Sequence, residues 1–160
     1  MLLISNQNIE PNLKKSFCEM FSLTIAEGEK PSNSPFFSFN KNILSLHLNK
    51  KMDSSEEKKA SRSTTSPPLS FDFIDTWKRI KPGTKNQRKK DPLLKALALK
   101  KNENEGPINL IDATCGMGKD SLFFIKQGIK TLAYERSPYL APLLWDAERR
   151  ASEDPELGPI

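Results

Sequence analysis

The chain has 160 residues and 36% hydrophobic side chains, enough for one domain with a sizeable core. No apolar run approaches the roughly 20 residues of a membrane span, and the apolar start is too short for a signal-peptide core. The two cysteines do not indicate a disulfide framework. These properties exclude a membrane-spanning or disulfide-stabilised class and favour the cytoplasm.

The net charge of +5 is unevenly distributed along the chain. Lys78 to Lys101 carries ten basic residues and one acid, a local charge of +9, while the fifteen basic and nineteen acidic residues elsewhere give −4. Such a cluster is typical of a protein with a polyanionic partner, most simply nucleic acid. A solvated, lysine-rich linker explains the same charge, and charge alone does not choose between the two.

Short elements are predicted in the N-terminal part. Met1–Ser5 is a candidate strand, and Asn12–Ser22 has the apolar spacing of an amphipathic helix. Phe36–Phe39 and Ile43–Leu48, separated by Asn40–Asn42, predict a β-hairpin.

The second hairpin strand also places His47, the only histidine of the chain. It alternates with Leu46 and Leu48, so the pattern predicts that it lies on the exposed face. This position argues against a catalytic role.

A polar segment and a third strand are predicted next. Asn49–Pro68 has one Met and one Ala as its only apolar side chains, so it predicts a disordered insert. Leu69–Asp75 predicts a strand with Phe71 and Phe73 on one face and Asp72 on the other.

A short helix follows the basic segment Trp77–Lys90. Asp91 is expected to be its N-cap and Pro92 its first residue. Its predicted apolar side consists of Leu93, Leu94, Leu97 and Ala98.

The centre of the sequence is a strand that runs into a glycine turn. Ile108–Asp112 has the short apolar run of a buried parallel strand and ends on an acid. Gly116 and Gly118 form the turn, because glycine permits backbone conformations and a close ligand approach that a Cβ would block.

A helix and a second strand complete a βαβ unit. Ser121–Gln127 predicts the helix, which Gly128 ends at C′. Thr131–Tyr134 is the second strand, and Glu135 stands at its C-terminal end. Ligands of open α/β sheets bind beside the C-terminal ends of the strands, where such an acid accepts hydrogen bonds from ribose hydroxyls.

The strand, glycine turn and helix are similar to several nucleotide-binding motifs. A P-loop is excluded, because Ala113 stands where its first Gly is required and Asp120 where Ser or Thr must follow Lys119. A dinucleotide fingerprint fits except for Ser121 at its last position. An S-adenosylmethionine site fits with Asp112 near the methionine end and Glu135 on the ribose. A strand–turn–helix without a ligand is the remaining alternative.

The last predicted helix opens at Ser137-Pro138 by the same capping logic. Pro142 falls near its first turn and is expected to delay or kink its start. Cys115, in the glycine turn, is interpreted as a packing residue, because a thiol nucleophile lacks a nearby His.

With these residues assigned, the chain resembles the ribosomal RNA small subunit methyltransferase J family from near Phe36 to about Gly158. The resemblance rests on four motifs: F-D-F at Phe71–Phe73, the basic segment running into D-P-L-L-K-A-L, D-A-T-C-G-M-G-K-D, and Y-E-R-S-P. It implies S-adenosyl-L-methionine as cofactor and methylation of a guanine N2 in 16S rRNA of the small ribosomal subunit. The implied cofactor residues are Asp112, Gly116, Gly118, Lys119, Asp120, Glu135 and Arg136.

The sequence departs from the family pattern at three places. Cys115 replaces Ala, and the polar insert 49–68 is longer than usual. The Asn/Asp-Pro-Pro-Phe/Tyr type of motif that binds the target amine does not follow Glu135. Asp91-Pro92 and Asp154-Pro155 lack its aromatic residue and are interpreted as structural, so no catalytic residue is assigned.

The resulting expectation is an α/β protein with two parts. Residues 1–75 form a small α/β subdomain with a hairpin, and residues 76–160 form the first βαβ unit of a Rossmann-like methyltransferase domain whose C-terminal half is missing. The chain alone is expected to be inactive. The candidate RNA-binding residues are Lys85, Arg88, Lys89 and Lys90, with no metal site.

Two rival functions stay open at this point. The first is a non-catalytic basic RNA-binding fragment. The second is a nicotinamide-dependent oxidoreductase fragment, which is supported only by the pair Gly116 and Gly118.

Overall fold

The chain folds into two compact units in the computed structural model. Unit 1 comprises Met1–Phe71 and Ala141–Asp146, and unit 2 comprises Asp72–Leu140 and Ala147–Ile160. The structure describes residues 2–5, 10–26, 34–48, 67–81, 90–97 and 109–158. Most of the predicted polar insert, residues 49–66, lies outside these ranges.

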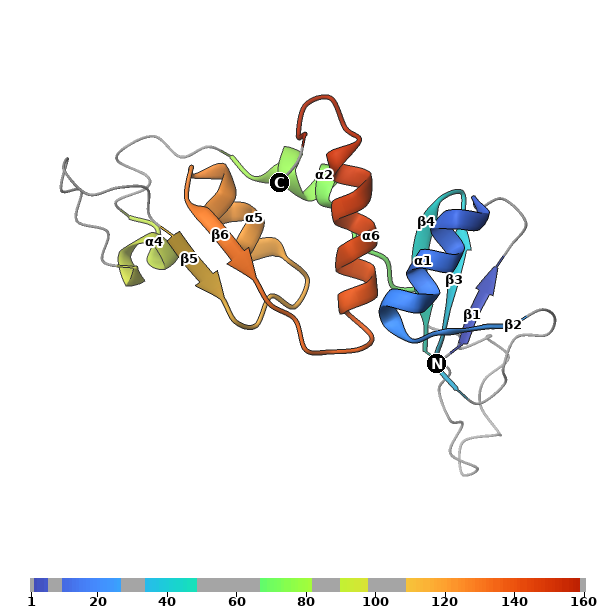
Figure 1. Ribbon diagram of the computed structural model, residues 1–160. Coiled ribbons are helices and arrows are strands. Elements are labelled where there is room, and N and C mark those ends of the chain that lie inside the picture. The colour runs from blue at the N-terminus through green and yellow to red at the C-terminus, as the bar shows by residue number, and fades with distance from the viewer. Residues whose placement is uncertain are drawn as a thin grey trace, which may run out of the picture. The chain divides into compact units, whose positions relative to one another are not determined.

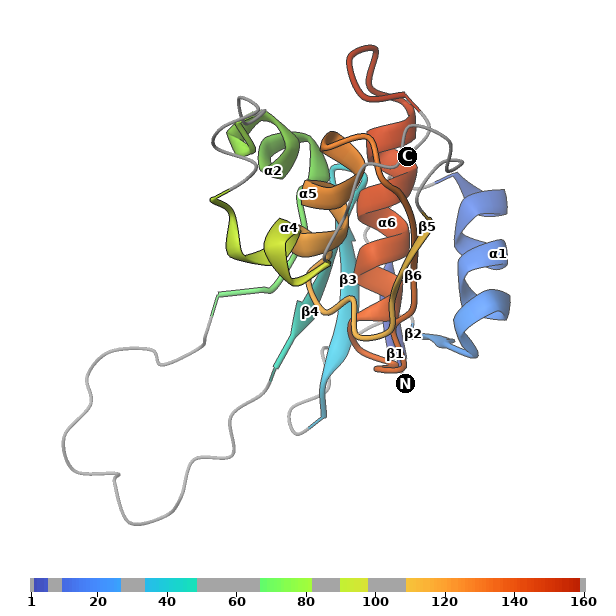
Figure 2. The same cartoon turned by 90° about the vertical axis from the view of Figure 1, so that its left-hand side faces the viewer.

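Unit 1 contains a sheet with the strand order β2-β1-β3-β4 (Figures 1 and 2). Strand β1 (Leu2–Ser5) is parallel to β2 (Thr24–Ala26) and to β3 (Phe36–Asn40), and β3 is antiparallel to β4 (Ile43–His47). The predicted first strand and hairpin are confirmed. Strand β2 was not predicted, since three residues are too few to show a period.

The hairpin turn consists of Lys41 and Asn42, which both have left-handed backbone conformations (φ 48° and 65°). Positive φ at both central residues is the conformation of a type I′ turn, whose twist matches that of the flanking strands. Asn tolerates this conformation better than Lys does. The turn therefore fixes the register of β3 and β4 at some local cost.

His47 is half-buried rather than exposed, which corrects the sequence-based expectation. Its ring stacks on Phe36 with centroids 4.4 Å apart, and its Nε2 lies 2.7 Å from the Ser38 hydroxyl. Both partners are on the neighbouring strand β3, where cross-strand side chains come within contact. The histidine thus has a packing role in unit 1.

The core of unit 1 is aromatic. Helix α1 (Pro11–Phe21) confirms the predicted helix and buries Phe17. The Phe17 ring lies 5.5 Å from the Phe39 ring and 5.4 Å from the Trp145 ring of helix α6 (Ala141–Ser152). Such tilted aromatic contacts add specific geometry to the burial of apolar area.

The outer edge of β4 is closed by two different groups. Leu46 exchanges two backbone hydrogen bonds with Leu69, of 2.8 and 2.9 Å. The backbone N–H of Leu44 donates to the buried carboxylate of Asp146 on α6 at 3.1 Å. Edge strands with free N–H groups are sites of unwanted pairing, so these contacts protect the sheet.

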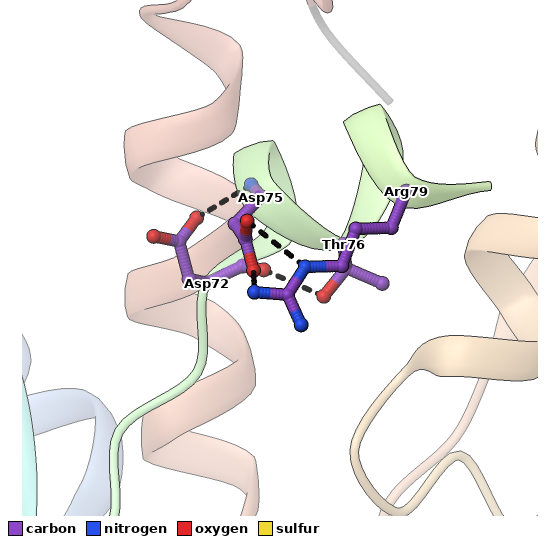
Figure 3. A network of polar contacts seen from close by, with 4 residues as sticks. All are labelled: Asp72, Asp75, Thr76 and Arg79. Carbon is purple, nitrogen blue, oxygen red and sulfur yellow. Dashed lines mark hydrogen bonds and ion pairs between the residues drawn. The ribbon is translucent and has the colours of Figure 1, made fainter.

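The predicted strand Leu69–Asp75 is wrong except at Leu69, which forms an isolated bridge with Leu46, because helix α2 begins at Phe73 (Phe73–Arg79). Figure 3 shows the cause. The side chain of Asp72 accepts a hydrogen bond from the Asp75 N–H at 2.9 Å, and Thr76 donates its hydroxyl to the Asp72 carbonyl. Arg79 then pairs with Asp75 through two contacts of 2.8 and 3.1 Å.

Helix α4 (Pro92–Ala96) confirms the predicted cap, since the Asp91 carboxylate accepts hydrogen bonds from the next two free N–H groups. No residue of the helix is buried, and Leu93 of the predicted apolar side is 40% exposed; Ala98 of that side lies outside the described residues.

Unit 2 contains the predicted βαβ unit. Strands β5 (Asn109–Asp112) and β6 (Lys130–Ala133) are parallel, with Ile111 opposite Leu132. Helix α5 (Lys119–Lys126) connects them and begins two residues earlier than predicted. Gly128, with φ 81°, follows its end, as expected for a C′ glycine.

One face of this two-stranded sheet is uncovered. Leu122 and Phe124 of α5 are buried, whereas Ile111 is 65% and Leu132 54% exposed. The expectation of a fully buried strand is therefore wrong. A strand in a parallel sheet is buried only where elements cover both faces, and among the described residues of unit 2 this face has no cover.

The last helix starts late. The Ser137 hydroxyl accepts from the N–H groups of Tyr139 and Leu140, both at 3.3 Å, but α6 itself begins at Ala141. Pro142 lies in its first turn, which agrees with the predicted delay.

Candidate functional site

The candidate site is the turn between β5 and α5 in unit 2. Gly116 has φ 57° and Gly118 has φ 74°, conformations that side chains with a Cβ adopt only with strain. The Gly118 N–H donates to the Cys115 carbonyl at 2.8 Å, and Gly118 is also the N-cap of α5. Both glycines are therefore required by the backbone of this turn.

Asp112 ends β5 with both carboxylate oxygens engaged. Its Oδ1 accepts from the backbone N–H of Thr114 at 3.1 Å, and its Oδ2 accepts from the Ser121 hydroxyl at 2.6 Å. The half-buried carboxylate is thus held from the turn on one side and from α5 on the other.

Glu135 makes the corresponding contacts after β6. Its Oε2 accepts from the Gly116 N–H at 2.8 Å, and its Oε1 accepts from the Ser137 N–H at 2.7 Å. Backbone hydrogen bonds continue past the ends of the two strands. The Tyr134 N–H donates to the Asp112 carbonyl, and the Tyr134 carbonyl accepts from the Cys115 N–H. Glu135 therefore joins the glycine turn to the loop after β6.

The remaining predicted cofactor residues flank this centre. Lys119 and Asp120 form the first turn of α5, and Arg136 follows Glu135; all three are exposed. The structure thus connects Asp112, Gly116 and Glu135 directly with the turn. It leaves the three charged side chains at the surface beside it, and their role stays a prediction.

The thiol of Cys115 lies inside the turn, 3.8 Å from the Ser121 hydroxyl. Burial is the largest effect and raises the pKa of Cys115 above its ordinary value; the hydrogen bond with Ser121 opposes it, and the carboxylates of Asp112 and Glu135 raise the pKa further. A raised pKa keeps the thiol protonated at neutral pH, which favours the packing role over a nucleophile.

Ser121 is the residue that sequence reasoning missed. The sequence pattern shows it as the first residue of a helix and as a departure from the dinucleotide fingerprint, yet it is buried and donates a hydrogen bond to Asp112. The signal that could have identified it is a hydroxyl at the one fingerprint position that must pack against the strand.

The candidate RNA-binding residues are only partly described. Lys85, Arg88 and Lys89 lie outside the described residues, and Lys90 is exposed immediately before the α4 cap. In the described ranges, no three His, Cys, Asp or Glu side chains are grouped as metal ligands. No described helix is long and apolar enough to span a membrane.

Comparisons with known proteins identify the family of this chain. A family model described as a SAM-dependent methyltransferase matches residues 36–160. A ribosomal RNA small subunit methyltransferase J from Alteromonas mediterranea is 32% identical over 84% of this chain and 46% of its own length. The protein of the same name from Pseudoalteromonas translucida is 39% identical over 57% of this chain and 34% of its own length.

A solved structure has the same fold. It is a SAM-dependent methyltransferase from Neisseria gonorrhoeae, with a TM-score of 0.66 and 21% identity over 98% of this chain and 55% of that one. The chain therefore spans between a third and just over half of the length of these three proteins.

Proposed function

Because the chain belongs to the SAM-dependent methyltransferase family, we propose that its glycine turn binds S-adenosyl-L-methionine for the methylation of ribosomal RNA. The observation that carries the proposal is the placement of Asp112 and Glu135. The two carboxylates follow neighbouring parallel strands and meet at one glycine turn. This is the edge at which open α/β sheets bind their ligands.

The chemistry of the site suits the cofactor. A carboxylate offers about four acceptor positions, and each of these two carboxylates uses two of them within the protein. Acceptor positions therefore remain for the ribose hydroxyls at Glu135 and for the ammonium group of the methionine part at Asp112. Beside Gly116 a ligand can approach the backbone closely, because no side chain intervenes.

Methyl transfer requires mainly that the target amine and the sulfonium of the cofactor are aligned. S-adenosyl-L-methionine supplies an activated methyl group, which a nucleophilic amine displaces directly when it lies in line with the sulfonium. This chain's own contribution is to hold and orient the cofactor. We assign no acceptor for the protons of the target amine, because the sequence has no motif for that role after Glu135.

We further propose 16S rRNA of the small ribosomal subunit as the substrate, with guanine N2 as the methyl acceptor. The name of the relatives supports ribosomal RNA of the small subunit, and the local charge of +9 between Lys78 and Lys101 supports a nucleic-acid partner. Guanine N2 rests on the resemblance of the sequence motifs. Lys and Arg contacts to phosphates give affinity without sequence preference, which suits a segment that positions RNA. A cytoplasmic location follows from this substrate.

The cofactor proposal is tested by following backbone amide signals in NMR titrations with S-adenosylhomocysteine and with NAD. We expect shifts centred on the turn 112–118 and on Glu135 for the first ligand only. Glu135 is tested by its alanine variant, and exposed Glu156→Ala is the matched control. Binding of NAD alone would support an oxidoreductase fragment instead, and binding of RNA without either ligand would support a non-catalytic module.

The substrate proposal has its own experiment. Replacing Arg88, Lys89 and Lys90 by Glu should weaken binding to all RNA sequences alike and reduce the dependence of affinity on salt. Replacing Lys14, Lys15 and Lys41, which lie in unit 1, by Glu is the control with the same change of charge. An affinity that does not change with salt would contradict the proposal.

A further inference from the structure

We propose that Ser121 is a positioning residue whose hydroxyl fixes the carboxylate of Asp112 for the amino-acid end of S-adenosyl-L-methionine. The inference rests on the proposed cofactor. It assigns a role to a side chain that the glycine-turn motif itself does not include, and it predicts a specific pattern of ligand discrimination.

The geometry around Asp112 supports this role. Ser121 is only 5% exposed and lies in the first turn of α5, so its side chain is directed by the packing of the helix. Its Oγ lies 2.6 Å from Asp112 Oδ2, while Thr114 N–H holds the other oxygen at 3.1 Å. Two contacts from two different segments fix the plane of the carboxylate, which one contact would leave free to turn.

The direction of the hydrogen bonds follows from the available protons. An ionised carboxylate only accepts, so the single hydroxyl proton of Ser121 points toward Asp112. The Ser121 oxygen is then free to accept from the Cys115 thiol, 3.8 Å away, which keeps its proton at neutral pH. The hydrogen bonds therefore run in one direction, from the Cys115 thiol to the Ser121 hydroxyl and from this hydroxyl to the Asp112 carboxylate.

The consequence concerns one part of the ligand. The acceptor positions of Asp112 that remain free bind a positively charged hydrogen-bond donor best. The α-ammonium of the methionine part is such a group. The ribose, by contrast, is assigned to Glu135. Loss of the Ser121 hydroxyl should therefore weaken recognition of the amino-acid end and leave recognition of the nucleoside unchanged.

The experiment compares two ligands on the 160-residue chain by NMR titration. S-adenosylhomocysteine carries the amino-acid end, and 5′-methylthioadenosine lacks it. We expect Ser121→Ala to weaken affinity for the first by about tenfold or more, as for a lost hydrogen bond to a charged group, and to leave the second within about twofold. Ser152→Ala, which removes an exposed serine hydroxyl that donates to a helix carbonyl, should change neither.

A double-mutant cycle separates positioning from general structural support. If Ser121 acts through Asp112, then Ser121→Ala should have no further effect in an Asp112→Asn background. Ser121→Cys keeps the size and a weak donor, so it should bind S-adenosylhomocysteine with intermediate affinity and provides the measurement if the alanine variant does not fold. Equal losses for both ligands, or additive effects in the cycle, would overturn the inference.

The two proposals fail in different ways. If the wild-type chain binds S-adenosylhomocysteine and Ser121→Ala binds it equally well, only the role of Ser121 is wrong. If the wild-type chain binds neither ligand, both alone and with the unmatched part of the Alteromonas relative added, the proposed cofactor site is wrong, and the role of Ser121 falls with it.

Discussion

The carboxylate of Glu135 accepts a 2.8 Å hydrogen bond from the backbone N–H of Gly116, nineteen residues earlier in the chain. Its second oxygen accepts from the N–H of Ser137 at 2.7 Å. The residue proposed to hold the ribose thus also holds the turn on which the cofactor would lie. Removal of the Glu135 carboxylate should therefore affect both cofactor affinity and the stability of the turn.

Glu135→Ala should weaken binding of S-adenosylhomocysteine by roughly 1.5–3 kcal/mol, the scale of hydrogen bonds to a charged group. It should also lower the thermal midpoint, because two backbone N–H groups lose their acceptor. Glu135→Gln keeps one carbonyl oxygen, so it should fall between alanine and the wild type in both measurements. A fully stable, fully binding alanine variant would show that water replaces the carboxylate without loss.

Much of this site was predictable from the sequence, because its constraints are local. The positive φ angles of Gly116, Gly118 and Gly128 follow from turns that only glycine forms easily. The Asp91 cap was likewise visible in the residues that follow it, whereas the Ser137 hydroxyl holds only the turn before α6. Such features depend on neighbours within a few positions.

What sequence reasoning missed depends on partners far along the chain. Asp146 bonds to Leu44, 102 residues earlier, and no periodic pattern indicates such a contact. The helix at Phe73 was predicted as strand because alternation was weighed above the capping ability of Asp72. The exposure of Ile111 was missed because an apolar run does not say whether anything covers it.

Asp146 supplies a second prediction. Its side chain is 1% exposed and accepts from Leu44 N–H at the edge of β4. Asp146→Ala should lower the free energy of unfolding by about 1–3 kcal/mol, because a buried N–H loses its acceptor. Denaturant unfolding measures the change, and Glu148→Ala, an exposed acid on the same helix, should be nearly neutral. Equal stability of the two variants would contradict the role given to this contact.

The hairpin turn gives a prediction of the opposite sign. Lys41 occupies a left-handed conformation with φ 48°, which costs an ordinary side chain about 1 kcal/mol. Asn adopts this conformation more readily, so Lys41→Asn should raise the free energy of unfolding by up to about 1 kcal/mol. Lys15→Asn, at an exposed helical position, should not stabilise the protein and is the control. A destabilised Lys41→Asn variant would mean that the lysine makes a contact worth more than the strain.

Cys115 predicts how stability depends on pH. Burial raises its pKa in the folded chain, whereas in the unfolded chain it titrates near its ordinary value of about 8.5. Above that pH the unfolded state binds fewer protons than the folded state, so stability falls as pH rises toward the folded pKa. Cys115→Ala should remove this part of the alkaline loss and leave the fold intact. Parallel pH profiles of the wild type and the variant would contradict the expectation.

The last prediction concerns the uncovered face of the β5–β6 sheet. Ile111 and Leu132 lie opposite each other in the register and are both more than half exposed, as is Tyr134. A parallel sheet needs cover on both faces, and an open apolar strand is an aggregation hazard. The match to the Alteromonas relative extends over 46% of that protein, so its unmatched part is long enough to supply such a cover.

We therefore expect the 160-residue chain alone to show no detectable guanine-N2 methyltransferase activity and only weak cofactor binding. Adding the unmatched part of the Alteromonas relative, fused or as a separate polypeptide, should protect Ile111 and Leu132 from hydrogen exchange and tighten binding. Leu132→Asp should prevent this gain, because a charge would then be buried against the added part. Ser152→Asp, which adds the same charge at an exposed position of α6, is the control. Transfer of labelled methyl groups to small-subunit RNA by the 160-residue chain itself would contradict the prediction.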